Sequence, residues 1–173
     1  MENQASSKSL IINYGIYLGV TTVIINLIMY AMGMHLDPHW SVSVISGIFF
    51  VGFIVLGIKK YKESNEGFLS WGQGVKVGVG ISIIAALIGV IYNYIFMSFI
   101  EPNFMAEVME IQNQKLIDQG QTEEQIEAIN KMGEAFQSPT LMAAMGIIGS
   151  AIGGFVVSAI VAAIMKKTEE EQY

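Results

Sequence analysis

The 173-residue sequence contains no cysteine and no arginine, and only 14% of its residues are charged. Without cysteine, the chain can form no disulfide, no thiol nucleophile and no thiolate metal site. Without arginine, it lacks the guanidinium fork that proteins commonly use to bind phosphate and carboxylate groups. The net charge of −6 argues against nucleic acid as a partner, because nucleic-acid binding needs a basic surface.

Apolar residues are abundant, at 53% of the chain, and the mean hydropathy is +0.52. A soluble domain averages about 25% charged residues, so this composition predicts a membrane protein. Four long runs carry at most one charge each, and each approaches or exceeds the ~20 apolar residues that cross a bilayer. These runs are 10–34, 40–58, 71–100 and 141–165. We predict an all-α membrane protein with four transmembrane helices in a single domain, residues 1–173.

The segment between the third and fourth runs differs in composition from the rest of the chain. Residues 101–138 contain eight acidic residues and two lysines, a net charge of −6. Apolar residues recur there at helical spacing, and Gly120 suits the end of a helix. Thr122-Glu-Glu-Gln125 then matches a capping box that opens a second helix. We predict an extracytoplasmic amphipathic helical hairpin over 102–137, with helices Pro102–Gln119 and Glu123–Gln137.

The lysines predict an orientation for the chain. If the N-terminus is cytoplasmic, seven of the nine lysines fall on the inner side, whereas Lys115 and Lys131 fall outside. Short cytoplasmic connections of multi-pass proteins carry an excess of positive residues. We therefore expect cytoplasmic N- and C-termini and a hairpin on the opposite side. In a bacterium this corresponds to the inner (cytoplasmic) membrane, with the hairpin in the periplasm.

Three residues are expected at the membrane interface. Trp40 and Trp71 begin the second and third runs, where amphipathic aromatic rings are enriched at the headgroup level. Lys76 is the single charge of the third run and lies about 7.5 Å along the helix from Trp71, at 1.5 Å per residue. A lysine stem can extend over that distance back to the headgroups.

Small residues recur four residues apart along the third and fourth runs. In lipid, small side chains favour helix association because they let two backbones approach closely. The third run carries Gly74, Gly78, Ser82 and Ala86, and the fourth carries Gly146, Ser150, Gly154 and Ser158. We expect these ridges to pack the two helices together within one molecule. Packing between two copies of the chain is the alternative.

His35, Asp37 and His39 form a group with metal-ligand side chains at close spacing. In an extended segment, alternate residues point the same way, and imidazole with carboxylate would suit zinc or a similar ion. Pro38 interrupts the segment, however, and the sequence shows no fourth ligand. A polar turn between two spans is therefore the favoured interpretation, and no cofactor is implied.

Two motifs flank the polar turn between the second and third runs. They are Gly57-Ile-Lys-Lys-Tyr61 and Trp71-Gly-Gln-Gly-Val-Lys76-Val-Gly78. Both resemble the signature of a bacterial family of integral membrane proteins, domain of unknown function 4199, which more often has phenylalanine at the position of Trp71 and alanine at that of Gly74. The likeness covers nearly the whole chain and includes Tyr92, the turn Ile100–Phe104, the hairpin tip Gly120–Ile126 and Pro139. The resemblance implies four spans and no assigned activity.

These observations predict a small, non-enzymatic membrane protein that acts as an accessory or scaffold subunit through protein–protein contacts. Its expected partners are the lipid bilayer and either another membrane protein or further copies of the chain. A small solute or ion transporter or channel is the alternative. Its path would be lined by the asparagines of the spans together with Ser82, Ser150 and Ser158, so their placement relative to one cavity separates the two hypotheses.

Overall fold

A computed structural model describes residues 2–134 and 138–168 of the chain. Its helices are α1 (Glu2–Ala31), α2 (Trp40–Ser64), α3 (Trp71–Ile95), the π-helix η1 (Phe96–Ile100), α4 (Phe104–Asp118), α5 (Glu123–Glu134) and α6 (Pro139–Met165). Four of these segments are long and apolar enough to cross a membrane, with η1 continuing α3. The predicted all-α fold, with two short helices between the third and fourth spans, is confirmed.

Several helices differ in length from the apolar runs that predicted them. α1 begins at Glu2, well before the run 10–34, and it ends at Ala31, ahead of Gly33 in the left-handed region at φ 67°. α2 continues to Ser64, beyond the predicted end at 58. Lysine and glutamate end a hydropathy run but are good helix formers, so the helix outlasts the run. Part of the predicted α5, residues 135–137, lies outside the described residues.

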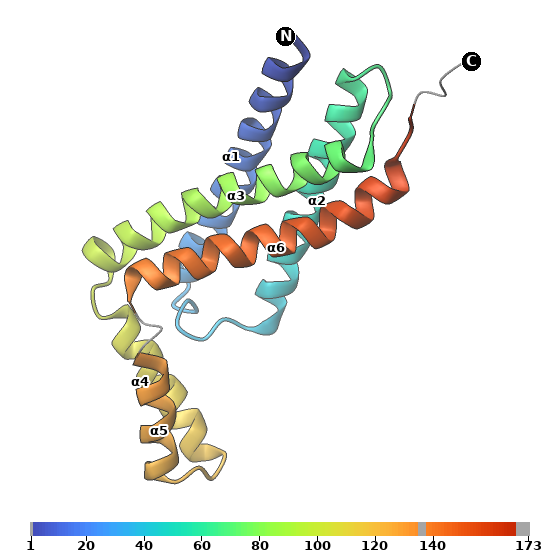
Figure 1. The fold of residues 1–173 in the computed structure, drawn as a ribbon. Coiled ribbons are helices and arrows are strands. Elements are labelled where there is room, and N and C mark those ends of the chain that lie inside the picture. The colour runs from blue at the N-terminus through green and yellow to red at the C-terminus, as the bar shows by residue number, and fades with distance from the viewer. Residues whose placement is uncertain (1, 135–137, 169–173) are drawn as a thin grey trace.

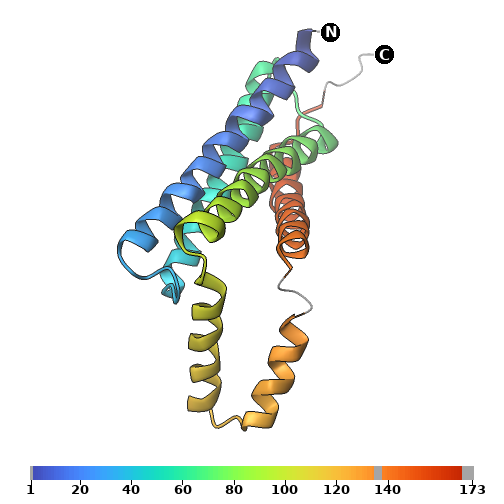
Figure 2. The ribbon, with the colours of Figure 1, turned by 90° about the vertical axis from the view of Figure 1, so that its left-hand side faces the viewer.

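α3 is the central helix, because it packs against α1, α2 and α6 (Figure 1). The start of α1 and the end of α6 lie at the same end of the bundle, which we name the terminus end. The loop between α1 and α2 lies at the opposite end. There α4 and α5 extend away from the long helices and are joined by a turn at their far ends, so we name it the hairpin end (Figure 2).

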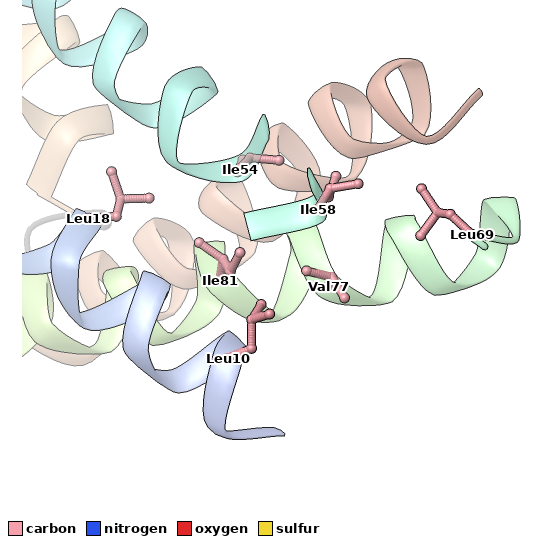
Figure 3. Packing of buried hydrophobic residues seen from close by; sticks show 7 residues of the cluster. All are labelled: Leu10, Leu18, Ile54, Ile58, Leu69, Val77 and Ile81. Carbon is pink, nitrogen blue, oxygen red and sulfur yellow. The ribbon is translucent and has the colours of Figure 1, made fainter. Parts of the chain in front are cut away.

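The apolar core lies where α1, α2 and α3 meet towards the terminus end (Figure 3). Its buried members are Leu10, Leu18, Ile54, Ile58, Leu69, Val77 and Ile81. Most other large apolar side chains of the long helices are exposed, for example Ile91 and Ile160. A soluble protein avoids such extensive apolar exposure, whereas helices that face lipid require it.

α3 and α6 form a close seam of small residues. A Cβ atom added at Gly78 would overlap Ser158, and one added at Gly154 would overlap Ser82. Ser82 and Ser158 are fully buried in this seam. Ser150 Oγ donates across it to the Ser82 carbonyl at 3.0 Å, so a polar group of the span is satisfied between helices.

The end of α6 is held by the connection between α2 and α3. Leu69 and Lys167 exchange two backbone hydrogen bonds, with N···O distances of 2.8 and 2.9 Å. Lys62 Nζ donates to the Met165 carbonyl at 2.8 Å. A cation at a helix C-terminus satisfies an orphan carbonyl and complements the helix dipole. These contacts fasten the C-terminal end of α6 to the end of α2 and to the α2–α3 connection.

Candidate functional site

His35 and Glu101 form a largely buried pair at the hairpin end. His35 Nε2 lies 2.9 Å from Glu101 Oε1 and 2.7 Å from Glu101 Oε2. Only 14% of the histidine side chain and 17% of the carboxylate side chain are exposed. The Nδ1 atom of His35 is also buried and has no hydrogen-bond partner among the described residues. The pair joins the α1–α2 loop to the end of η1, across 66 residues of sequence.

Aromatic rings enclose this pair on several sides. The His35 ring contacts Tyr30 edge-to-face at 4.9 Å between centroids and stacks on Phe104 at 6.1 Å. Phe96 lies at the centre, with Tyr30, Tyr92 and Phe104 all within 5.6 Å between centroids. We name Tyr30, His35, Tyr92, Phe96, Glu101 and Phe104 the hairpin-base cluster. Edge-to-face and offset aromatic contacts fix the relative orientation of the helices that carry them.

The π-helical turn of η1 places two members of the hairpin-base cluster. The Glu101 N–H donates to the Phe96 carbonyl at 2.9 Å, a bond across five residues rather than four. Pro102 follows and cannot continue the helical hydrogen bonding. The widened turn directs Phe96 into the cluster, where it is 5% exposed. Single π-turns of this kind occur frequently at functional sites.

A second, exposed ion pair holds the same loop against the hairpin. Lys115 Nζ lies 2.6 Å from Asp37 Oδ1, with both side chains more than half exposed. Exposed pairs contribute little to stability, typically below about 1 kcal/mol. The Asp37–Lys115 pair therefore adds little stability. Its main effect is to keep α4 beside the loop that carries His35.

The structure does not support the metal-site hypothesis for His35, Asp37 and His39. His35 pairs with Glu101 and Asp37 pairs with Lys115. His39 instead caps α2, with Nδ1 accepting from the Ser41 N–H at 3.4 Å. The loop bends at residues 35–37, so alternate side chains do not converge as they would in an extended strand. The described residues contain no group of three or more metal-ligand side chains that could hold an ion.

The structure places the predicted packing residues unequally. Gly74 faces Ala162, Gly78 faces Ser158 and Gly154 faces Ser82, all within the α3–α6 seam. Gly146, by contrast, has open space where a Cβ would point, and Ala86 is half-buried. The two helices therefore approach most closely on the terminus side of the seam.

The polar residues that a transport path would need do not line one common cavity. Ser82 and Ser158 are sealed inside the α3–α6 seam. Asn26 and Asn93 are exposed on the outside of the bundle, and each donates to a carbonyl four residues earlier in its own helix. This arrangement offers no continuous polar lining within one copy of the described chain.

The predicted interface residues lie near the ends of the long helices. Trp40 begins α2 at the hairpin end and is 70% exposed. Trp71 begins α3 at the terminus end, and its Nε1 atom donates to the Ala159 carbonyl at 3.1 Å. Lys76 is exposed and lines a cavity between α1, α2 and α3.

Sequence reasoning missed two features of this arrangement. It considered His35 as a metal candidate or as part of a polar turn and did not pair it with Glu101, although both are predicted at the same membrane face and carry opposite charges when ionised. It also missed the packing of α1 on α3, where a Cβ at Gly15 would overlap Ile84 and one at Gly19 would overlap Ile88. The four-residue glycine spacing on α1 was the available signal for that contact.

The chain has four long apolar helices, a seam of buried small residues between two of them, and large apolar side chains exposed on the outside of the bundle. Together these features define a multi-pass α-helical membrane protein. The family described as Protein of unknown function (DUF4199) matches residues 13–167, and the chain belongs to this family. Comparison with curated proteins and with solved structures gave no match.

Proposed function

We propose that this protein is a non-enzymatic accessory or scaffold subunit that binds a protein partner through its projecting hairpin. The observation that carries the proposal is that the hairpin is anchored to the bundle and yet exposes large apolar side chains along α4 and α5. The start of α4 is held by the hairpin-base cluster, and the last turn of α4 is held by the exposed Asp37–Lys115 pair. Both hairpin helices extend away from the long helices (Figure 2).

The hairpin exposes apolar side chains along both of its helices, beside its acidic residues. Ile117, Ile129 and Met132 are 53%, 45% and 74% exposed. α4 has no buried residue, and Ile126 is the only buried large apolar side chain described in α5, so the hairpin builds little core of its own. Large apolar side chains surrounded by charge are typical of a protein-binding surface. The partner is another membrane protein, or a second copy of the chain.

The distribution of lysines supports the predicted orientation for this function. Seven lysines belong to helix ends and connections of the terminus end, and two belong to the hairpin. We infer that both termini are cytoplasmic and that the hairpin faces the opposite side, the periplasm if the membrane is the bacterial inner membrane.

The roles of the two histidines support a non-enzymatic function. His35 is held by Glu101 within the hairpin-base cluster, and His39 caps α2. The sequence has no cysteine that could act as a nucleophile. The Ser41 hydroxyl lies 3.0 Å from His39 Nδ1, and the same nitrogen accepts from the Ser41 N–H as the cap of α2, so this contact serves the helix end.

A photo-crosslinking amino acid at Ile129 tests the proposal in the native membrane. We expect one discrete crosslinked protein, lost when Met132→Glu places a charge on the same face. Gln112→Glu is the matched control, because it adds the same charge at an exposed polar position of α4. Native mass spectrometry of gently extracted protein then identifies the complex.

The outcomes separate the two kinds of partner. A crosslinked dimer of this chain identifies a second copy, and a crosslink to a different protein identifies a hetero-complex. A lone monomer in both measurements, or equal loss of crosslinking in both glutamate variants, would show the proposal to be wrong.

A further inference from the structure

The one cation inside the long apolar runs lines a cavity at the terminus end. This cavity has a volume of about 380 Å³, within the range of about 300–1,000 Å³ typical of small-ligand sites. Ile11 of α1 and Val77 of α3 form its apolar wall. Its polar groups come from Ser7, Tyr61, Asn65, Gln73 and Lys76, so three helices and one connection contribute to it.

Lys76, Tyr61 and Gln73 each bring to this cavity a hydrogen-bond donor that is not used within the described residues. Lys76 has no ion pair and no hydrogen bond among the described residues, and the Tyr61 hydroxyl has none either. Gln73 uses Oε1 to accept from the Ser70 N–H at 2.8 Å, which leaves its Nε2 donor group available. Asn65 donates to the Phe68 carbonyl at 3.0 Å. None of the described residues that line the cavity is acidic.

An unpaired ammonium beside two uncommitted donors is suited to an anion. A charge near the hydrocarbon region is normally paired, and this lysine has no protein partner to pair with. Lys76 begins about 7.5 Å along the helix from Trp71, and its stem can extend from there to the level of the headgroups. Lysine binds phosphate as a point charge without needing the arginine fork that this sequence lacks.

We propose that the cavity lined by Lys76, Tyr61 and Gln73 is a binding site for a phosphate group. This chemistry is shared by the headgroups of anionic phospholipids and by free phosphate esters. Lys76 neutralises the anion, and the Tyr61 hydroxyl and Gln73 amide donate hydrogen bonds to its oxygens. The site does not depend on the hairpin or on its protein partner.

Binding measured on the purified full-length protein tests this site. Native mass spectrometry compares phosphatidylglycerol with diacylglycerol of the same acyl chains, which lacks the phosphate. Calorimetry with inorganic phosphate in lipid-free detergent examines the free ion. We expect Lys76→Gln to weaken phosphate-dependent binding about tenfold, the effect of losing a hydrogen bond to a charged group.

Lys59→Gln is the matched control, because it removes the same charge from an exposed position on α2 at the same end of the bundle. Tyr61→Phe removes only a hydroxyl and is expected to weaken binding about threefold; it keeps the test valid if Lys76→Gln fails to fold. Lys76-dependent preference for phosphatidylglycerol assigns the site to a lipid. Lys76-dependent binding of inorganic phosphate assigns it to a free anion.

Three results would overturn the site: no phosphate-dependent binding by the wild-type protein, unchanged binding in folded Lys76→Gln, or an equal loss in Lys59→Gln. The last result would show that general surface charge, rather than the cavity, attracts the anion.

Discussion

At the scale of single residues, the His35–Glu101 pair illustrates how a membrane protein uses a nearly buried charge. His35 Nε2 contacts the Glu101 carboxylate, and aromatic rings pack around the largely buried pair. Removing one member of such a pair leaves the other buried without compensation, which is more destabilising than removing both. The pair therefore fixes the geometry of the hairpin base because neither residue can change alone.

We predict that His35→Ala lowers the free energy of unfolding by about 2 kcal/mol, because Glu101 loses its buried hydrogen-bond donor. In a chain of this size, that corresponds to a melting temperature roughly 4 to 8 °C lower. The double variant His35→Leu/Glu101→Leu should recover part of the loss. Thermal unfolding in detergent, analysed as a double-mutant cycle, measures the coupling.

Lys115→Gln provides the comparison for that experiment, because it breaks the exposed Asp37 pair at the same end of the bundle. Its expected effect is below about 1 kcal/mol. Additive effects of the His35 and Glu101 substitutions would contradict the pairing.

Glycine residues of the seam make a second prediction at this scale. Gly78→Leu and Gly154→Leu insert side chains into the space of Ser158 and Ser82, and we expect each to destabilise the monomer by about 1 to 3 kcal/mol. Gly146→Leu is the control from the same predicted ridge, and it should be tolerated because the space there is open. Thermal unfolding measures the difference. If the two seam variants only dissociate an oligomer and leave the monomer intact, the seam lies between copies.

At the scale of helices, local sequence signals determined the ends of the hairpin elements well. Gly120 adopts φ 83° after α4, and its N–H and that of Gln121 donate to the Ile117 and Leu116 carbonyls. The Thr122–Gln125 capping box forms as predicted. These signals are short-range, so the sequence alone specifies them. The π-turn of η1 was not predicted, because tertiary contacts of Phe96, rather than any nearby residue type, favour it.

We predict that the hairpin opens independently of the bundle. α4 has no buried residue, and Ile126 is the only buried large apolar side chain described in α5. Segments with few buried contacts exchange amide hydrogens through local unfolding. Hydrogen exchange read by mass spectrometry should therefore be at least about tenfold faster in 104–134 than in 74–93.

The polar end of α2, residues 59–64, controls for simple access to water in this measurement. It is also outside the apolar run, yet Lys62 fastens it to α6. Exchange there should be slower than in the hairpin. Equal protection of the hairpin and α3 would show that the hairpin is part of the cooperative bundle.

At the scale of the whole molecule, hydropathy was sufficient to predict the number of spans and the general position of the hairpin. The length of an apolar run and the position of the polar segment that ends it are properties of the local sequence. They can be predicted without knowing which residues are in contact. Which helix is central could not be predicted in the same way. That depends on matching shapes, such as Gly15 against Ile84, between residues that are remote in sequence. The candidate site was missed for the same reason, because His35 and Glu101 become neighbours only after folding.

Because α3 uses α6 as a packing partner, we predict that a chain ending at residue 137 cannot form a stable three-helix bundle. The buried hydroxyl and small residues of the seam would then face lipid. Pulse–chase labelling should show faster degradation of this fragment than of the full chain. Co-expression of 138–173 as a separate span should restore its half-life. A fragment as long-lived as the full chain would show that the seam is dispensable.

Because the residues that meet in the seam are far apart in sequence, they are also synthesised at different times. Ser150 is made 68 residues after the Ser82 carbonyl to which it donates. At about 5–20 residues per second, roughly 3 to 14 s of translation separate the two groups. Throughout that interval the seam face of α3 has no α6 to cover it. Insertion machinery and membrane proteases therefore encounter α3 while its packing surface for α6 is still uncovered.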